Sequence, residues 1–245
     1  MKILYFHQYF STPKGSGGTR SYFISKELVK SGHQVQIVCL NDKRSNSGLK
    51  GPYRNGFRRG IVEGIDILEI NIPYSNNQNL FLRSITFLKF SIISTFIAVK
   101  TKCDLIYATS TPLTIALPGV FGKILRRRKF IFEVRDSWPE LPRALGLVKN
   151  PLLLILLNYL ERIAYYYADR CIALAPGISQ DIAEKGYKIK NIYTIPNAAD
   201  IKLFTPLETN KKKDPTLIPH YGKCLNTNSF IAAFTGAHGI ANGLD

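Results

Sequence analysis

The sequence is poor in acidic residues and contains no closely spaced pair of cysteines. It has 17 Asp and Glu residues against 33 Lys and Arg residues, which gives a formal net charge of +16. An excess of this size implies an anionic partner. The four cysteines show no C-x-x-C spacing. This argues against a zinc site and against a disulfide framework, and it favours free thiols in a reducing compartment.

Three familiar signals are also missing. No Gly-Lys-Ser or Gly-Lys-Thr follows the first glycine-rich loop, which excludes a P-loop. His7 and Gln8 interrupt the N-terminal apolar run too early for a signal peptide, so we expect the protein to stay in the cytoplasm. No RNP, zinc-finger or helix-turn-helix pattern accompanies the basic residues, so we expect no nucleic acid partner. An anionic membrane surface is the other candidate.

The first forty residues are the most informative part of the chain. An apolar run over 2–10 predicts a buried parallel strand, and helix-spaced apolar residues after residue 20 predict a helix that stops at Ser31-Gly32. A second strand is expected over 35–40. Gly15, Gly17 and Gly18 lie between the first strand and the helix. Exposed N–H groups at a helix N-terminus bind phosphate, so we expect a nucleotide, a nucleotide-sugar or a phosphorylated lipid here.

Two other interpretations of this glycine loop remain open. In the dinucleotide fingerprint G-x-G-x-x-G, Arg20 stands where the third glycine belongs, which weakens a nicotinamide-dependent oxidoreductase hypothesis. Asp42, near the end of the second strand, stands where a ribose-binding acid would lie and keeps that hypothesis open. Alternatively, the glycines serve only the geometry of a tight strand–helix turn.

The rest of the chain alternates between the two element types. Strands are expected over 65–72, 104–108, 129–134, 170–174 and 191–195, and helices over 80–100, 112–125, 151–168 and 178–185. This alternation predicts an α/β fold with a doubly wound parallel sheet. Ligands of such sheets bind outside the carboxyl ends of the strands.

A polar cluster follows the strand expected over 129–134. Asp136 is a candidate general base or sugar ligand, Arg135 a candidate phosphate ligand, and Trp138 a candidate stacking surface for a sugar or a lipid. The structural alternative is an Arg135–Asp136 pair with Trp138 in the core. A hydrolase dyad of Glu133 and Glu140 has little support, because one lies in a strand and the other in a loop.

The segment 80–99 is strongly apolar and about long enough to span a bilayer. Arg83, Lys89 and several Ser and Thr residues argue against spanning, and four of these small polar residues (84, 91, 94 and 95) fall near one side of a helix. An interfacial or groove-lining helix therefore fits the pattern. A core helix with solvated charges is the alternative.

The composition changes after residue 200. Residues 201–228 are polar, Lys-rich and contain proline, as in a linker or an exposed excursion. Residues 229–245 repeat the strand and glycine-loop pattern, and one strand cannot bury its own faces. We therefore expect a first domain over 1–200, a linker over 201–228 and the beginning of a truncated second α/β domain over 229–245.

Several of these segments carry a family resemblance. They are the Gly17-Gly18 loop, SGHQVQIVC at 31–39, VRDSWPE at 134–140, IPNAAD at 195–200 and FTGAHGIANGLD at 234–245. With them the chain resembles the N-terminal half of a GT-B, family-four retaining glycosyltransferase. Within that family it is similar to the transferases of N-acetylated deoxyhexosamines, such as N-acetyl-L-fucosamine, in O-antigen and capsule synthesis.

The resemblance implies an activity, partners and site residues. The activity is sugar transfer from a nucleotide-sugar to a polyprenyl-diphosphate-linked glycan at the inner face of the cytoplasmic membrane, with no metal and no other cofactor. Asp136 is the implied catalytic residue. The implied ligands of the donor diphosphate or the substrate are Gly17, Gly18, Arg20, Arg135, Trp138, Glu140, Asn197, Gly236, His238 and Gly239.

The resemblance also implies a missing part. The family's Glu-x7-Glu segment and its basic diphosphate ligands would fall beyond residue 245. We therefore expect no appreciable turnover from these 245 residues alone, and a second polypeptide is a candidate source of the donor half. A non-catalytic remnant that only binds membranes is the alternative function.

Overall fold

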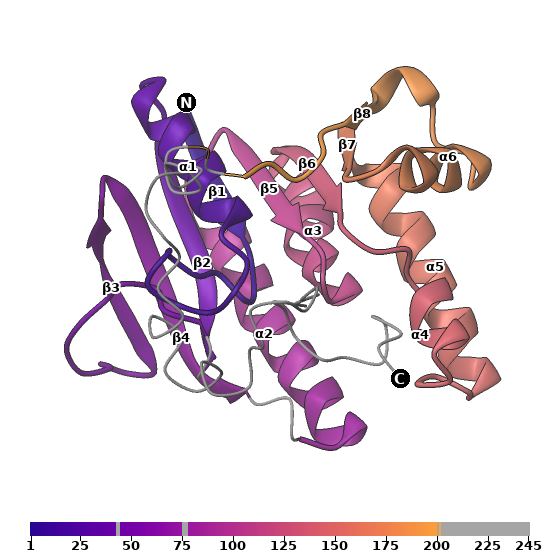
Figure 1. Cartoon of the computed structure of the whole chain (residues 1–245), viewed down its shortest axis with the longest axis horizontal. Helices are drawn as coiled ribbons and strands as arrows, with labels where there is room; N and C mark the ends of the chain where they lie inside the picture. The colour runs from indigo at the N-terminus through magenta and orange to yellow at the C-terminus, as the bar shows by residue number, and fades with distance from the viewer. Residues whose placement is uncertain (43–44, 75–77, 200, 202–245) are drawn as a thin grey trace, which may run out of the picture. The chain divides into compact units, whose positions relative to one another are not determined.

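The computed structural model describes residues 1–42, 45–74, 78–199 and 201 (Figure 1). Residues Met1–Asn197 form one compact unit, and the remaining residues group separately. The expected linker and second domain therefore lie almost wholly outside the described residues, as do Gly236, His238 and Gly239 of the expected site.

The compact unit is built on one eight-stranded sheet with the order β3-β4-β2-β1-β5-β6-β7-β8. Its strands are β1 (Lys2–Phe6), β2 (Gln34–Asp42), β3 (Phe57–Val62), β4 (Ile65–Tyr74), β5 (Leu105–Thr109), β6 (Lys129–Val134), β7 (Arg170–Ala173) and β8 (Ile192–Thr194). Neighbouring strands pair in parallel, except that β3 pairs antiparallel with β4 at one edge. The fold is thus α/β and Rossmann-like, as predicted, with one antiparallel strand added.

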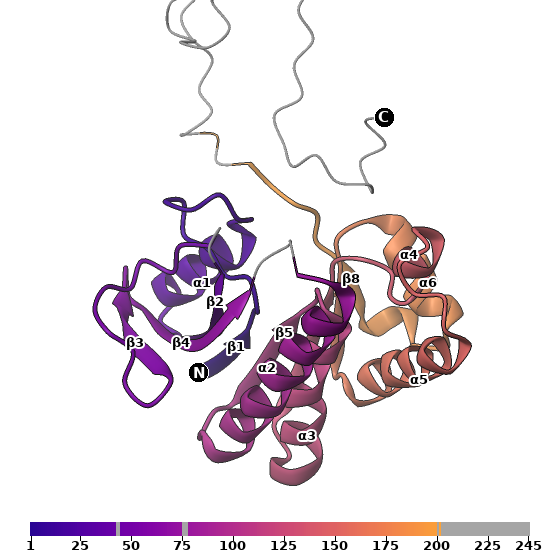
Figure 2. The ribbon, with the colours of Figure 1, turned by 90° about the horizontal axis from the view of Figure 1, so that it is seen from below.

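Helices cover the two faces of the sheet unequally (Figure 2). One face carries α1 (Arg20–Lys30), and the other carries α2 (Leu80–Lys100), α3 (Ala116–Arg126), α5 (Pro151–Tyr167) and α6 (Pro176–Glu184). Alternating side chains of β1 separate the two cores: Leu4 and Phe6 pack on the side of α2, and Ile3 and Tyr5 on the side of α1.

Glycines allow α3 to approach the sheet closely. A Cβ atom at Gly119 would overlap the ring of Phe130 in β6, and one at Gly122 would overlap the side chain of Ile106 in β5. The helix therefore packs closely on side chains of β5 and β6, the two strands that precede Thr111 and Arg135. Short helical turns complete the unit: η1 (Leu113–Ile115), α4 (Glu140–Ala144) and η2 (Ile189–Asn191).

Most expected elements are present, with shifted ends. The bounds of α2 and β6 match the expected ones. The first strand stops at Phe6 rather than at residue 10, because the chain turns there and Phe10 N–H donates to the His7 carbonyl. The helix expected over 112–125 starts as the 3-10 turn η1. The strand β3 was not expected, since Arg58, Arg59 and Gly60 interrupt its apolar pattern.

The described cysteines are free and buried, namely Cys39, Cys103 and Cys171. Burial raises the pKa of the Cys39 thiol well above its ordinary value, and it raises the pKa of Cys171 to about 12. A thiol kept protonated in this way is a poor nucleophile and a poor metal ligand, so these cysteines are packing residues.

Candidate functional site

A cavity of about 420 Å³ opens at the carboxyl edge of the sheet, where several strands end within reach of one another. Each of β1, β2, β5, β6 and β7 contributes a residue at or just after its end. The lining residues are His7, Tyr9, Ser16, Gly17, Gly18, Asp42, Ser45, Thr111, Arg135, Asp136, Leu174 and Asn197. Five of the expected site residues are therefore brought together here: Gly17, Gly18, Arg135, Asp136 and Asn197.

The glycine loop is folded tightly against the segment that follows β2. A Cβ atom at Gly15 would lie 2.7 Å from the Asn46 backbone nitrogen and would overlap the Ser11 hydroxyl. Thr12 N–H donates to the Asn46 carbonyl at 2.8 Å. These contacts require glycine at position 15 for close approach. They hold the loop in front of the first turn of α1, where unpaired N–H groups and the helix dipole favour an anion.

Arg135 places a positive charge beside this loop. A Cβ atom at Gly18 would lie 3.5 Å from Nη2 of Arg135, so the guanidinium and the loop backbone share one side of the cavity. The Arg135 N–H donates to Ser110 Oγ at 2.9 Å, which ties the chain after β6 to the chain after β5. A guanidinium next to loop N–H groups is suited to a phosphate or a diphosphate.

His7 orients Arg135. Arg135 Nη1 lies 3.3 Å from His7 Nε2, and His7 Nδ1 lies 2.8 Å from Ser21 Oγ. Because a guanidinium can only donate, Nε2 accepts, and the proton of the neutral ring sits on Nδ1 and is donated to Ser21. Burial and the charge of Arg135 lower the pKa of His7 well below its ordinary value. The imidazole is therefore an uncharged acceptor for Arg135.

Asp136 accepts a hydrogen bond from the hydroxyl of Thr111. Within the described part of the chain, the side chain of Arg135 contacts His7 and that of Asp136 contacts Thr111, so the alternative of a structural Arg135–Asp136 pair is not observed. The two side chains instead line the same cavity from neighbouring positions. One supplies a cation and the other an acceptor for a hydroxyl.

Arg20, a further expected ligand, does not line the cavity. Its side chain is only 10% exposed and lies 3.2 Å from the fully buried carboxylate of Glu133. It also donates to the carbonyls of Ile195 and Pro196 at 2.8 and 2.7 Å. Tyr107 and Thr109 donate their hydroxyls to the same carboxylate. Arg20 thus joins the start of α1 to the chain segment that carries Asn197.

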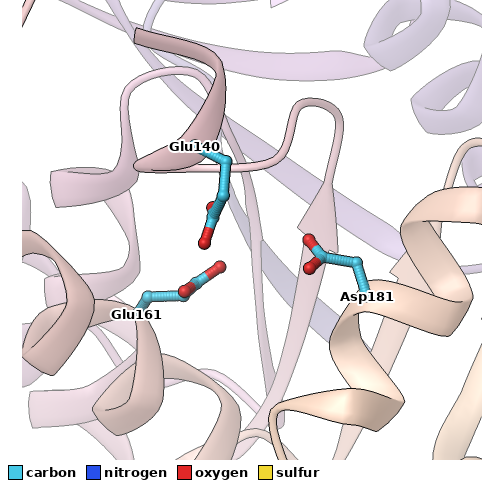
Figure 3. Close-up of side chains that lie close together, drawn as sticks. All are labelled: Glu140, Glu161 and Asp181. Carbon is cyan, nitrogen blue, oxygen red and sulfur yellow. The ribbon is translucent and has the colours of Figure 1, made fainter. Parts of the chain in front are cut away.

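Glu140 also lies outside the cavity, in an acidic cluster with Glu161 and Asp181 (Figure 3). The three carboxylates point toward one another, a geometry that could hold a metal ion. The ammonium group of Lys185, however, lies 2.9 Å from Glu140, 2.8 Å from Glu161 and 3.3 Å from Asp181. This lysine already supplies the positive charge, and the cluster ties α4, α5 and α6 together.

The pKa values of Lys185 and Glu161 in this cluster are both raised, for different reasons. Burial alone would lower the pKa of Lys185, but hydrogen bonds to Glu161 and Glu140 raise it above the ordinary value. Burial raises the pKa of Glu161, and hydrogen bonds from Lys185 and Tyr165 offset this only in part.

Trp138, expected at the cavity, is instead half-buried and packs against the hydrophobic core.

Some of the lining residues were not predicted from the sequence. His7 and Tyr9 follow a buried strand, as the Arg135 cluster does, and that signal could have marked them. Ser45 gives no such signal, because it reaches the cavity only through the path of the chain after β2.

The sequence matches Glycosyltransferase Family 4 over residues 17–203. The chain belongs to this family. The match includes Gly17 and Gly18 of the glycine loop, the strands β2 to β8 and Asn197, and so all of the cavity-lining residues that lie after residue 16. A comparison with curated proteins gives no match.

Solved structures of the GT-B type share the fold of this family member. Sucrose-phosphate synthase from Thermosynechococcus elongatus is 16% identical, with a TM-score of 0.53 over 84% of this chain and 50% of that chain. The structure described as trehalose-6-phosphate from E. coli bound with UDP-2-fluoro glucose is 10% identical, with a TM-score of 0.50 over 76% of this chain and 42% of that chain. The chain thus spans about half the length of these structures, and identities this low show the fold alone.

Proposed function

We propose that this chain is the acceptor-side domain of a glycosyltransferase that moves a sugar from a nucleotide-sugar to a lipid-linked glycan. One observation carries the proposal. In a member of Glycosyltransferase Family 4, the glycine loop, Arg135, Asp136 and Asn197 converge on one cavity at the carboxyl edge of the sheet. A phosphate-binding loop beside a guanidinium and a carboxylate suits a ligand that joins a diphosphate to a sugar.

Each group then has a role in transfer. The backbone N–H groups at Gly17 and Gly18 and the guanidinium of Arg135 would stabilise the charge that develops on the leaving diphosphate. The carboxylate of Asp136 would orient a sugar hydroxyl, or accept the proton of the attacking hydroxyl. Asn197 would contribute from the chain segment that leaves the compact unit. Rate enhancement would rest on positioning and on electrostatics.

The donor and acceptor classes follow from different observations. The E. coli structure of the same fold was solved with UDP-2-fluoro glucose, which supports a nucleotide-sugar donor. The motifs similar to N-acetyl-L-fucosamine transferases support an N-acetylated deoxyhexosamine and a role in O-antigen or capsule synthesis. A polyprenyl-diphosphate-linked acceptor would require the protein to work at the inner face of the cytoplasmic membrane, and the net charge of +16 favours that location.

The remaining donor contacts would come from a second α/β domain. The chain covers about half of the structures that it resembles, so we propose that a C-terminal domain or a second polypeptide completes the donor site. Gly236, His238 and Gly239 would open that domain. The 245 residues alone are then expected to show no appreciable turnover, and adding the separately expressed second domain should restore transfer.

The decisive experiment is glycan analysis in the source cells. Deletion of the coding sequence should leave a lipid-linked precursor that is shorter by the sugar this protein adds, as read by mass spectrometry. The native gene should restore the glycan, whereas Arg135→Met and Asp136→Asn should lower transfer by about 100-fold. Glu27→Gln, an exposed carboxylate on α1, is the matched control and should behave as the native gene does. An unchanged glycan in the deletion strain would refute the proposal.

A further inference from the structure

The outer side of α2 is apolar, although it faces solvent. Phe81, Ile85, Leu88, Ile92 and Phe96 recur every three or four residues and are 46–72% exposed. This spacing places them in one stripe along the helix. A stripe of this kind normally faces a core, so on a solvent-facing side it marks a contact surface.

The inner side of the same helix packs into the protein and carries polar residues among its apolar ones. Ser91 and Ser94 are fully buried, and the Ser91 hydroxyl donates to the Thr114 carbonyl. Ala98 lies beside them against α3. Two of the four polar residues that suggested an interfacial helix, Ser91 and Ser94, thus pack inside the protein, whereas Ser84 is exposed and the apolar residues of the stripe remain outside. Since Phe90 and Ala98 on the inner side belong to the core, α2 is apolar on its outer side as well as on its inner side.

Exposed apolar side chains are also present on α3, which packs along α2, and on α5, which packs against α3 on the same face of the sheet (Figure 2). Ile124 and Leu125 are exposed on α3. Leu152, Ile155, Leu156 and Tyr159 are exposed on α5 at helical spacing. We call the exposed apolar side chains of these three helices the apolar helix face. It is too extensive to consist of scattered surface residues.

The charges on these helices are almost all positive. The basic residues are Arg83, Lys89 and Lys100 on α2, Lys123 and Arg126 on α3, and Arg162 on α5. Lys123 pairs with Asp169, which lies beyond the end of α5. The three helices contain one acidic residue, Glu161, which is buried and paired with Lys185. A surface that combines exposed apolar side chains with an excess of cations is complementary to a bilayer containing anionic lipids.

We propose that the apolar helix face docks on an anionic lipid bilayer, with α2 lying in the interface. Length and composition alone would let α2 cross a membrane over Phe81–Lys100. However, Phe90 and Ala98 are part of the core, and α2 packs along α3, so spanning would remove one helix from the folded unit. Docking keeps these contacts and lets only the outer stripe enter the lipid.

This orientation would bring the cavity to the membrane. The helix α2 follows the carboxyl end of β4 and precedes the amino end of β5, and α5 likewise lies between β6 and β7. Their N-terminal turns therefore lie at the edge of the sheet where the cavity opens. The inference deepens the proposed function, since it names the surface that would hold the site near a lipid-linked acceptor. The docking inference is tested by lipid binding alone. A protein that failed to bind lipid would therefore leave the proposed transferase function to be decided separately by the glycan analysis.

The test is sedimentation of the purified protein with vesicles. Vesicles of equal parts phosphatidylglycerol and phosphatidylcholine should bind the protein, and pure phosphatidylcholine or added salt should weaken binding. Phe81→Glu/Ile85→Glu on α2 and Leu152→Glu/Leu156→Glu on α5 should each lower the partition coefficient by about tenfold or more. All four side chains are exposed, so circular dichroism and thermal melting should remain as in the native protein.

A matched control separates this face from net charge. Ile61→Glu/Ile189→Glu makes the same change in charge at two isoleucines that are also exposed but lie off the three helices, and it should change binding by less than about threefold. Equal losses in the control and the face variants would overturn the proposal, as would no binding to anionic vesicles. A stable dimer of the native protein that dissociates in the face variants would assign the face to a protein contact and overturn it too.

Discussion

Replacing Arg20 with methionine should destabilise the domain strongly, because it would leave the carboxylate of Glu133 buried without a cation. The Glu133 side chain is fully buried, and its remaining partners, Tyr107 and Thr109, are neutral. Breaking a buried pair from one side costs about 3–5 kcal/mol. The two backbone carbonyls that also lose Arg20 belong to exposed residues, where water can replace it, so the carboxylate dominates the cost.

That loss is a large share of the roughly 5–15 kcal/mol that stabilises a typical domain. For a domain of this size it corresponds to a fall in Tm of roughly 6–20 °C. Urea unfolding can be followed by the fluorescence of Trp138, the single tryptophan, which packs against the core. The double variant Arg20→Met/Glu133→Gln should recover most of the loss, because the introduced amide keeps an oxygen for Tyr107 and Thr109 and carries no charge.

A surface pair provides the control. Arg59 binds Asp66 with its side chain 63% exposed, so Arg59→Met should cost less than about 1 kcal/mol. If Arg20→Met cost no more than Arg59→Met, the reasoning from burial would be refuted. A double variant as unstable as Arg20→Met would refute the role given to the Glu133 charge.

Two further predictions concern titrating groups. Lys185→Met should lower the free energy of unfolding by about 3 kcal/mol at neutral pH. Since Lys185 holds down the pKa of Glu161, its loss raises that pKa further, and the folded variant then binds a proton at Glu161 more readily. The Tm deficit of the variant relative to the native protein should therefore shrink between about pH 7.5 and about pH 5. A deficit that grew on acidification would contradict this. Because the pKa of His7 is lowered in the folded protein, the unfolded state binds more protons at pH values just below the ordinary histidine pKa. The free energy of unfolding should therefore decrease as the pH is lowered through this range, by up to about 1.4 kcal/mol per pH unit. Urea midpoints of His7→Gln should lack this pH dependence.

The fold could be predicted because its apolar runs are bounded by polar, glycine and proline residues that mark the ends of strands and helices. The bounds of α2 and β6 follow from long apolar segments flanked by polar residues. The strand β3 could not be found in this way, because its arginines and glycine break the apolar pattern, and the arginines instead pair with Asp66 and Glu69 of β4 across the edge of the sheet. Local patterns do not contain the register of such a strand.

The site was predictable where its residues follow strands. Gly17, Gly18, Arg135 and Asp136 all do so, and they line the cavity. Arg20 begins α1 directly after the same loop, yet its side chain pairs with Glu133, a residue 113 positions away. A charge partner at that distance depends on the order of strands in the sheet, which the local sequence around either residue does not reveal.

The cavity also has a consequence for how this protein is made. Its lining runs from His7 to Asn197, nearly the whole length of the compact unit. The central strand β1 pairs with β5, which follows it in the chain by about a hundred residues, and Arg20 donates to the carbonyls of Ile195 and Pro196. During synthesis, which proceeds from the N-terminus, the glycine loop therefore leaves the ribosome long before its partners. The site is completed only when the last strand has been translated, and a chain that stops earlier would expose half of a sheet instead of a binding site.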